Sequence, residues 1–213
     1  MSVSCLFCDV SPLSDPSLFS RGMAVLPWED RRKRVMRYRF EKDRHLCLGA
    51  GLLLAYALRQ AGASNASLRN LPNGKPVLAA GPDIHFSLSH SGKLAVCAVS
   101  DQPVGVDVEV LHSADHDVMA LCFQKQEQEW ITQSSDPGRA YTQLWTRKES
   151  CLKRTGTGMA CDLRAFSVLP GRSIPEGIAF YEYEEMNCLI CVCAERSETV
   201  SFEKKISVTD LIK

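Results

Sequence analysis

Alternating hydrophobic and polar positions predict most of the strands in this chain. The clearest case is residues 104–110, where valine occupies every second position and Asp107 and Glu109 lie between the valines. Side chains two apart on a strand share a face, so both carboxylates are expected on the face opposite the valines. Similar patterns predict strands at residues 3–9, 84–92, 93–99, 164–169, 177–183 and 187–194.

Longer apolar patterns with a helical period predict four helices. They cover about residues 27–39, 41–60, 118–132 and 137–154, whereas residues 12–16 are expected to form a loop. The second helix is apolar nearly all round at its centre, which indicates a buried helix, and its Gly49 and Gly51 suggest close packing. In the last helix Glu149 and Lys153 stand four apart and therefore share a face.

The order of helices and strands hints at two halves of similar design. Residues 93–99 resemble residues 187–193, and each segment follows a long helix and a strand. The chain has 213 residues, of which 45% are hydrophobic, enough for one large domain or two small ones. We expect an N-terminal half over residues 1–104 and a C-terminal half over residues 105–213.

Charge and composition exclude several kinds of partner. The formal net charge is zero, so the chain lacks a global basic field for nucleic acid or a membrane surface. No apolar run reaches the roughly 18 residues of a membrane span. The N-terminus lacks the basic start and long apolar stretch of a signal peptide, so a cytoplasmic protein is expected.

Ten cysteines are present, and five of them lie among apolar neighbours. The Cys5–Cys8 and Cys188–Cys191 spacings would suit metal pairs, but both lie in strand-like stretches. Neither a zinc site nor disulfides are therefore expected. Five cysteines are expected to act as small buried hydrophobes: Cys97, Cys151, Cys188, Cys191 and Cys193.

Acidic residues supply the first candidate chemistry. If the 104–110 strand meets the last helix, Asp107, Glu109 and Glu149 come together with Lys153. Three carboxylates at one place repel each other unless a cation lies between them, and hard oxygen ligands of this kind suit Mg²⁺. The alternatives are a charged edge strand and an ordinary surface pair on a helix.

Basic and hydroxyl side chains supply candidate phosphate sites. Arg31 and Arg34 are neighbours on the first helix, and a guanidinium fork fits phosphate oxygens, although a solvated basic face is the alternative. Arg44 and His45 lie near a helix start, which favours anions. The turn at residues 72–76 presents Lys75.

The stretch at residues 84–92 ends with Ser89, His90 and Ser91, whose donors suit phosphate or ribose. A hydrolase with a Ser–His pair is the alternative, but the Gly-x-Ser-x-Gly elbow is absent from the sequence.

Four motifs follow one another along the chain: Gly74 to Pro76, Phe86 to Gly92, Gly105 to Glu109, and Trp145 to Lys153. Together they resemble the 4′-phosphopantetheinyl transferases of the surfactin-synthetase-activating type, over roughly residues 25 to 170. The resemblance implies transfer of the phosphopantetheine arm of coenzyme A to a serine of an acyl, peptidyl or aryl carrier protein. The other product would be adenosine 3′,5′-bisphosphate.

The resemblance also implies roles at the reacting end of coenzyme A. Asp107, Glu109 and Glu149 would hold Mg²⁺, or Mn²⁺ in its place, against the pyrophosphate. Glu149 is the candidate base for the carrier serine, directly or through a water. Lys153 would bind the pyrophosphate, with help from Lys148.

At the nucleotide end, the resemblance assigns the 3′-phosphate to Arg31, Arg34, Arg44 and His90. The family often carries a second arginine where this chain has Leu46, so His45 is an alternative to Arg44. Lys75 and Ser89 would line the adenine and ribose end.

The family fold implied by the resemblance is α+β. It has two pseudo-symmetric halves with the active site in the cleft between them, and the protein is usually a monomer. The N-terminal half would grip the nucleotide, and the C-terminal half would hold the metal and receive the carrier protein. The carrier would arrive near the helix of Glu127, against Met119 and Phe123, which are expected to be exposed. Glu127 matches a recurrent glutamate of the family or is a surface charge.

Two other functions use the same residues. A metal-dependent phosphodiesterase or nucleotide hydrolase would need the three carboxylates but would leave Lys75 and the Ser89–His90 turn unexplained. A non-catalytic coenzyme A-binding or carrier-binding module would not need the intact set of Asp107, Glu109, Glu149 and Lys153. The identity of the carrier and the tolerance for acyl-coenzyme A stay open.

Overall fold

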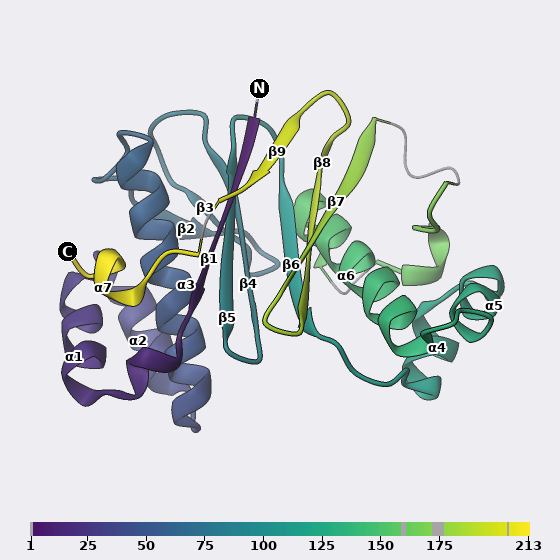
Figure 1. Ribbon diagram of the computed structural model, residues 1–213. Helices are drawn as coiled ribbons and strands as arrows, with labels where there is room; N and C mark the ends of the chain where they lie inside the picture. The colour runs from purple at the N-terminus through teal and green to yellow at the C-terminus, as the bar shows by residue number, and fades with distance from the viewer. Residues whose placement is uncertain (1, 159–160, 172–176, 204) are drawn as a thin grey trace.

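The computed structural model describes residues 2–158, 161–171, 177–203 and 205–213. Its elements form four layers, in which two central sheets pack against each other and a group of helices covers the outer face of each sheet (Figure 1). This arrangement confirms the expected α+β fold.

The first sheet has the strand order β4-β5-β1-β9. β1 (Ser2–Asp9) pairs antiparallel with β5 (Leu94–Ser100), and β5 pairs antiparallel with β4 (His85–Ser91). On its other side β1 pairs in parallel with β9 (Thr199–Phe202), so a strand from the end of the chain completes the sheet that the first strand begins.

The second sheet has the order β6-β8-β7 and is antiparallel. It consists of β6 (Gly105–Val110), β7 (Ile178–Glu185) and β8 (Cys188–Glu195). A separate two-stranded hairpin is formed by β2 (Leu68–Asn70) and β3 (Pro76–Leu78).

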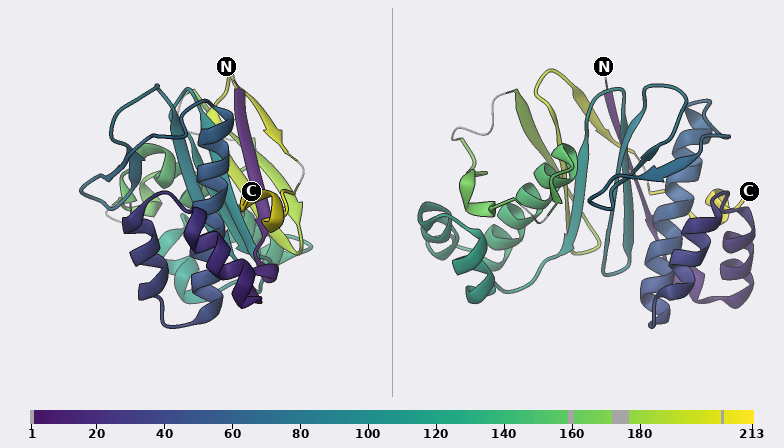
Figure 2. Two further views of the ribbon diagram at one scale, coloured as in Figure 1. Left: turned by 90° about the vertical axis from the view of Figure 1, so that its left-hand side faces the viewer. Right: turned by 180° about the vertical axis from the view of Figure 1, so that it is seen from behind.

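Helices cover both outer faces, as the views in Figure 2 show from the side and from behind. On the first sheet they are η1 (Ser11–Ser14), α1 (Pro16–Val25), α2 (Glu29–Arg37), α3 (Glu41–Gln60) and α7 (Val208–Leu211). Beside the second sheet they are α4 (His116–Cys122), α5 (Lys125–Thr132), α6 (Pro137–Thr155) and η3 (Leu163–Ala165).

Alternation along β1 explains how the layers are held together. Val3, Cys5 and Phe7 face the second sheet and pack with its valines. Leu6 and Cys8 point the other way, into the core around α3. Because successive side chains of a strand point to opposite faces, one strand contributes to both cores.

Several predicted elements are confirmed, and α3 has the predicted bounds. Close packing of its glycines is confirmed as well, because a Cβ at Gly49 would lie 2.4 Å from Cγ1 of Val10. The five cysteines that were expected to be buried are buried.

Three parts of the structure differ from the expectation. α1 begins at Pro16, where a loop was expected, because the Asp15 side chain accepts hydrogen bonds from the backbone of Ser17 and Leu18 and so caps the helix. The helix expected at residues 118–132 is two helices, since Gln124 and Glu127 form a capping box that starts α5.

The strand expected at residues 164–169 is also wrong, because that segment holds η3 and irregular backbone. Its carbonyl groups bind side chains of α6: Arg147 donates to Val168 at 3.0 Å, and Lys148 donates to Phe166 at 2.9 Å. These side chains supply the partners that a neighbouring strand would otherwise supply.

The end of the chain returns to the first half. β9 pairs with β1, and Val208, Leu211 and Ile212 join the buried cluster around α3. Of the segment 105–213, therefore, the part up to β8 builds the second sheet and its helices, whereas the last part packs with the N-terminal half. Within the described ranges, no helix has both the length and the apolar character to cross a membrane.

Candidate active site

The close approach of β6 and α6 depends on a glycine. A Cβ at Gly105 would lie 1.9 Å from the carbonyl oxygen of Ser150 and 2.5 Å from the backbone nitrogen of Arg154. Only glycine therefore lets the start of β6 lie directly against the α6 backbone. This contact brings the acidic strand next to the helix that carries Glu149 and Lys153.

One face of α6 looks into the space beside β6. Trp145, Glu149 and Lys153 follow each other at intervals of four, so they lie along one side of the helix. The helix starts at the Asp136 cap and ends at Gly156, whose φ of 72° is left-handed. Its last carbonyl groups point toward the turn that carries Lys75.

A cleft of about 490 Å³ lies between the two halves of the molecule. It receives side chains from α2, α3, β4, β6 and α6, so segments far apart in the sequence line one space. Eight of the predicted site residues line it: Arg31, Arg34, Ser89, His90, Asp107, Glu109, Glu149 and Lys153.

Asp107 is the most enclosed acidic group in this cleft, with 3% of its surface exposed. Its Oδ1 accepts from Lys153 Nζ at 2.6 Å and from Ser89 Oγ at 2.8 Å. Lys153 Nζ also donates to Ser89 Oγ at 2.8 Å, which closes a triangle of three groups. Among the described residues, no group donates to the buried Oδ2 of Asp107.

The other two carboxyl groups have raised pKa values. Burial raises the pKa of Glu109, although the hydrogen bond from Ser91 acts in the opposite direction. Burial also raises the pKa of Glu149, and the charge of Asp107 adds to the rise. Neighbouring carboxyl groups and burial both disfavour the ionised form of a carboxyl group. A cation close to it would stabilise that ionised form.

In the part of the chain that the structure describes, no three acidic, His or Cys side chains converge closely enough to enclose an ion. One oxygen of each of two carboxylates is hydrogen-bonded within the protein: Asp107 Oδ1 to Lys153 and Ser89, and Glu109 Oε2 to Ser91. The donor set nevertheless fits a hard divalent cation, because Asp107, Glu109 and Glu149 all line the cleft and Oδ2 of Asp107 has no hydrogen-bond partner among the described residues.

Three alternate serines of β4 connect it to β6. Ser87 Oγ accepts from the Val106 backbone nitrogen at 3.0 Å. Two residues on, Ser89 Oγ donates to Asp107, as described above. Ser91 Oγ donates to Glu109 Oε2 at 2.8 Å and accepts from the Val110 backbone nitrogen at 3.3 Å.

On the opposite side of the cleft, Arg31 is a largely buried cation. Its Nε finds no acceptor within the described part of the chain, and burial lowers its pKa. The guanidinium fits because position 51 is glycine, where a Cβ would lie 3.2 Å from Arg31 Nε. Arg34, one turn further along α2, is exposed and lines the same cleft.

His90 also lines this side of the cleft. Burial lowers its pKa, and the nearby charge of Lys153 contributes to the decrease. The imidazole is therefore largely neutral at neutral pH and able to donate one hydrogen bond.

Three predicted residues do not line this cleft, and one of them is Arg44. It donates from Nε to the Tyr38 carbonyl at 2.8 Å and so supports the turn between α2 and α3. The ring of His45, the alternative to Arg44, packs 5.7 Å from that of Phe19.

Lys75 lies beside the cleft. It donates to the carbonyl groups of Lys153 and Arg154 at the end of α6, and it lines an adjoining pocket of about 280 Å³. Burial lowers the pKa of this ammonium. Asn73 holds the same turn to α6 through a hydrogen bond to the Gly156 carbonyl.

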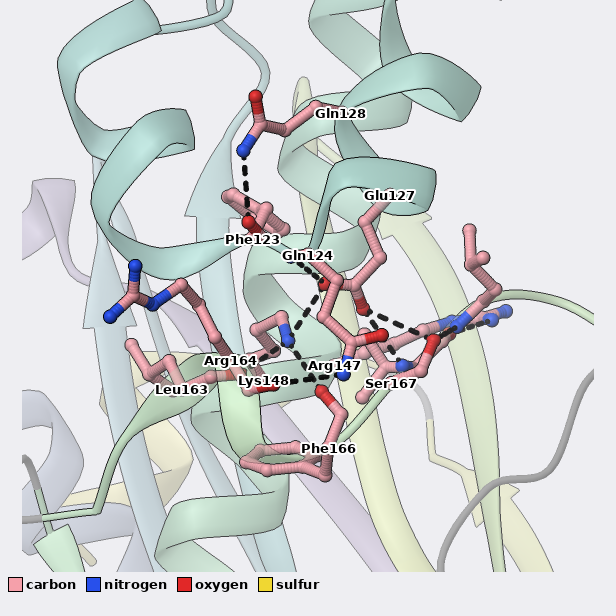
Figure 3. A network of polar contacts seen from close by, with 12 residues as sticks. Phe123, Gln124, Glu127, Gln128, Arg147, Lys148, Leu163, Arg164, Phe166 and Ser167 are labelled. Atoms are coloured by element: carbon pink, nitrogen blue, oxygen red, sulfur yellow. Dashed lines mark hydrogen bonds and ion pairs between the residues drawn. The ribbon is translucent and has the colours of Figure 1, made fainter.

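Lys148 lies in a different place from the one expected of a coenzyme A ligand. Its side chain is 0% exposed and pairs with Glu127 at 2.9 Å, as Figure 3 shows. It also donates to the carbonyl groups of Leu163 and Phe166. Successive helical residues point about 100° apart, so the neighbour of Glu149 cannot share its face. Glu127 is buried as well, which excludes a surface charge.

Trp145 was not predicted to have a role at the site, and Ser91 was expected as a donor to phosphate or ribose rather than to a carboxylate. Trp145 lines the cleft, and its interval of four from Glu149 was the signal that could have identified it. Ser91 binds Glu109, and the alternation of serines at positions 87, 89 and 91 was the corresponding signal.

Comparisons with known proteins agree with this geometry. A family model described as the 4′-phosphopantetheinyl transferase superfamily matches residues 103–201, and one described as the N-terminal part of a 4′-phosphopantetheinyl transferase matches residues 14–102. A 4′-phosphopantetheinyl transferase from Bacillus subtilis is 34% identical over 157 residues, which cover 70% of this chain and 68% of the relative.

Two further relatives extend the match. The transferase psf-1 of Bacillus pumilus is 32% identical over 74% of this chain and 71% of its own length. The transferase gsp of Aneurinibacillus migulanus is 28% identical over 86% of this chain and 81% of its own length. The chain therefore belongs to the 4′-phosphopantetheinyl transferases, the enzymes that transfer the phosphopantetheine arm of coenzyme A to a carrier protein.

Proposed function

We propose that the cleft between the halves is where this transfer occurs, and that Asp107, Glu109 and Glu149 hold a Mg²⁺ ion there. The observation that carries the proposal is the buried, unpartnered Oδ2 of Asp107 beside two carboxyl groups of raised pKa. When bound, Mg²⁺ would withdraw charge from the pyrophosphate of coenzyme A. Mn²⁺ is an alternative with the same oxygen ligands.

The residues of this chain then have distinct tasks in the reaction. The serine oxygen of the carrier attacks the phosphorus that bears pantetheine, and the bond to the bridging pyrophosphate oxygen breaks. Glu149 accepts the serine proton, directly or through a water. Lys153 binds the pyrophosphate and stabilises charge on the leaving adenosine 3′,5′-bisphosphate.

At the nucleotide end, Arg31, Arg34 and His90 bind the 3′-phosphate. Support comes from the Arg31 guanidinium, which is largely buried and whose Nε has no acceptor among the described residues. Lys75 and its turn line the adjoining pocket, which suits the adenine and ribose. Arg44 and Lys148 have structural tasks in this proposal.

The carrier protein is proposed to dock beside α4. Met119 and Phe123 were expected to be exposed there, but this is wrong, because they are 3% and 1% exposed and pack in the core around α6. On the same helix Leu121 is 72% exposed and is the apolar side chain available to a partner.

We further propose that the enzyme acts as a monomer in the cytoplasm. Both sides of the cleft come from one chain, so a second copy is not needed to complete it. All ten cysteines are free thiols, which suits a reducing compartment.

Intact-mass spectrometry of an apo carrier protein tests the proposal. With coenzyme A and Mg²⁺ the wild type should add one phosphopantetheine, and chelation of the metal should abolish the addition. Asp107→Asn and Glu149→Gln keep the side-chain shape but remove the charge, so we expect each to lower the transfer rate by about 100-fold or more.

The matched control is Asp101→Asn, an exposed carboxylate in the turn between β5 and β6. It should transfer at the wild-type rate. Circular dichroism should show that all three variants are folded. Transfer by Asp107→Asn at nearly the wild-type rate would contradict the metal site.

A further inference from the structure

β4 and β6 are neighbouring strands of different sheets. β4 forms its backbone ladder with β5, and β6 forms its ladder with β8. Between β4 and β6, hydrogen bonds of side-chain hydroxyl groups on β4 take the place of a backbone ladder. They come from Ser87, Ser89 and Ser91, which alternation places on one face of β4.

The three serines have different partners, and the difference separates a structural task from a functional one. Among the described residues, the side chain of Ser87 binds a backbone N–H of β6 alone. Ser89 shares its hydroxyl between Asp107 and Lys153. Ser91 accepts from the backbone at Val110 and donates its single proton to Glu109 Oε2.

The contact at Ser91 is held close by the next residue. Gly92 has a φ of 59°, and a Cβ there would lie 2.7 Å from Cγ2 of Val110. Glycine therefore permits both the left-handed turn and the short distance between the strands. The Ser91 hydroxyl is fixed by its own backbone and by the Val110 N–H, so it is a rigid donor for Glu109.

We propose that Ser91 is a positioning residue, which orients the Glu109 carboxylate so that its other oxygen, Oε1, faces the cation in the cleft. The inference rests on the proposed metal site, and no comparison assigns a role to Ser91. A glutamate side chain has three rotatable bonds, and the hydrogen bond at Oε2 removes rotations that would turn the carboxylate away. Partners behind a metal ligand of this kind typically change metal affinity or activity by about 10–100-fold.

The first test is Mn²⁺ binding, measured by electron paramagnetic resonance of the free ion with coenzyme A present and a coenzyme A blank subtracted. Ser91→Ala should bind Mn²⁺ about 10–100-fold more weakly than the wild type. Ser91→Thr keeps the hydroxyl and should restore most of the affinity. The Mg²⁺ concentration for half-maximal transfer should follow the same order, with little change in the KM for coenzyme A.

Ser87→Ala is the matched control, because it removes a hydroxyl that joins the same two strands but touches no carboxylate. It should lower the melting temperature about as much as Ser91→Ala while keeping wild-type affinity for Mn²⁺. Equal loss of Mn²⁺ affinity in both variants would mean that general loosening of the strands is the cause, and would overturn the proposal. Wild-type affinity in Ser91→Ala would overturn it as well.

Asp107→Asn distinguishes the proposed metal site from the positioning role of Ser91. If this variant binds Mn²⁺ as tightly as the wild type, the proposed metal site itself is wrong. If it loses binding while Ser91→Ala does not, the metal site stands and only the positioning role of Ser91 fails.

Discussion

At the scale of single residues, the cleft holds one basic and one acidic side chain whose hydrogen bonding is incomplete. Arg31 Nε and Asp107 Oδ2 are both buried, and neither has a hydrogen-bond partner among the described residues. A buried polar atom without a partner costs about 1–3 kcal/mol, more if it is charged. A ligand that supplies an anion at Arg31 and a cation at Asp107 would remove both costs.

The Arg31 side of the cleft gives a prediction about substrate preference. Replacing both Arg31 and Arg34 with Ala should raise the KM for coenzyme A by about 100-fold or more, because hydrogen bonds to charged groups contribute about 1.5–3 kcal/mol each. The preference for coenzyme A over 3′-dephospho-coenzyme A should fall in parallel. Steady-state kinetics with both substrates measures the two effects.

Arg37→Ala is the control, since Arg37 is exposed at the end of the same helix and does not line the cleft. Its KM should match that of the wild type. If the double variant keeps the full preference for coenzyme A, the 3′-phosphate binds elsewhere.

The periodicity of the sequence was sufficient to bring some residues together but not others. A period of two places Asp107 and Glu109 on one face of β6, and a period of four places Glu149 and Lys153 on one face of α6, and all four line the cleft. Lys148 was assigned to the cleft because it belongs to the same motif. The buried Glu127 that holds it away lies 21 residues earlier, so no local pattern shows the pair.

At the scale of elements, α5 and α6 are joined by this buried ion pair. Glu127 also accepts from the backbone nitrogen of Gln124 at 2.8 Å and of Val168 at 2.9 Å. Lys148 lies between the rings of Phe123 and Phe166, 5.6 and 4.8 Å from their centres. One pair of charges therefore holds the start of α5, the middle of α6 and the segment after η3 together (Figure 3).

Removing one charge of this pair should be costly. Lys148→Met leaves Glu127 buried without its cation, so the free energy of unfolding should fall by about 3–5 kcal/mol. Urea denaturation measures it. The exposed Lys125 on α5 provides the control, and Lys125→Met should stay within about 0.5 kcal/mol of the wild type.

The double variant Glu127→Gln with Lys148→Met should lose less stability than the sum of the two single variants, because neither charge is then left alone. A strictly additive result would show that the pair is not coupled.

Sequence patterns located best the helices and strands whose bounds depend on their own residues. α3 carries a long apolar pattern and was located to the residue. Residues 164–169 were wrongly predicted to form a strand. Carbonyl groups of this segment bind side chains from α6, and a local pattern cannot show that. α1 was missed although Asp15 and Pro16 form a helix start, because the same residue types also mark turns.

At the scale of the whole molecule, the four-layer arrangement buries most of the thiols. Eight of the ten cysteines are buried, and only Cys122 and Cys161 are partly exposed. Burial raises the pKa of Cys8 and Cys97 to about 12 and that of Cys188 to about 11. Since the thiolate is the reactive form, these three thiols are protected both by lack of access and by a low fraction of thiolate, and the other buried thiols are protected by lack of access.

Alkylation with iodoacetamide at pH 8, followed by mass spectrometry, checks this expectation. Two labels should appear rapidly, on Cys122 and Cys161, and the other eight only at the rate of unfolding. All ten should react in urea. Rapid labelling of Cys151, which lies where α6 packs on β8, would mean that this interface opens in the native protein.

The pairing of β9 with β1 has a consequence for how the enzyme is made. β1 leaves the ribosome long before β9, so its outer edge stays unpaired until residues 199–202 have been synthesised. An unpaired edge strand is an aggregation hazard, and the core around α3 is also incomplete until Val208 and Leu211 have followed. The first sheet and its helices therefore cannot complete their folding before residues 199–211 have left the ribosome, and the Arg31 side of the cleft reaches its final form only then.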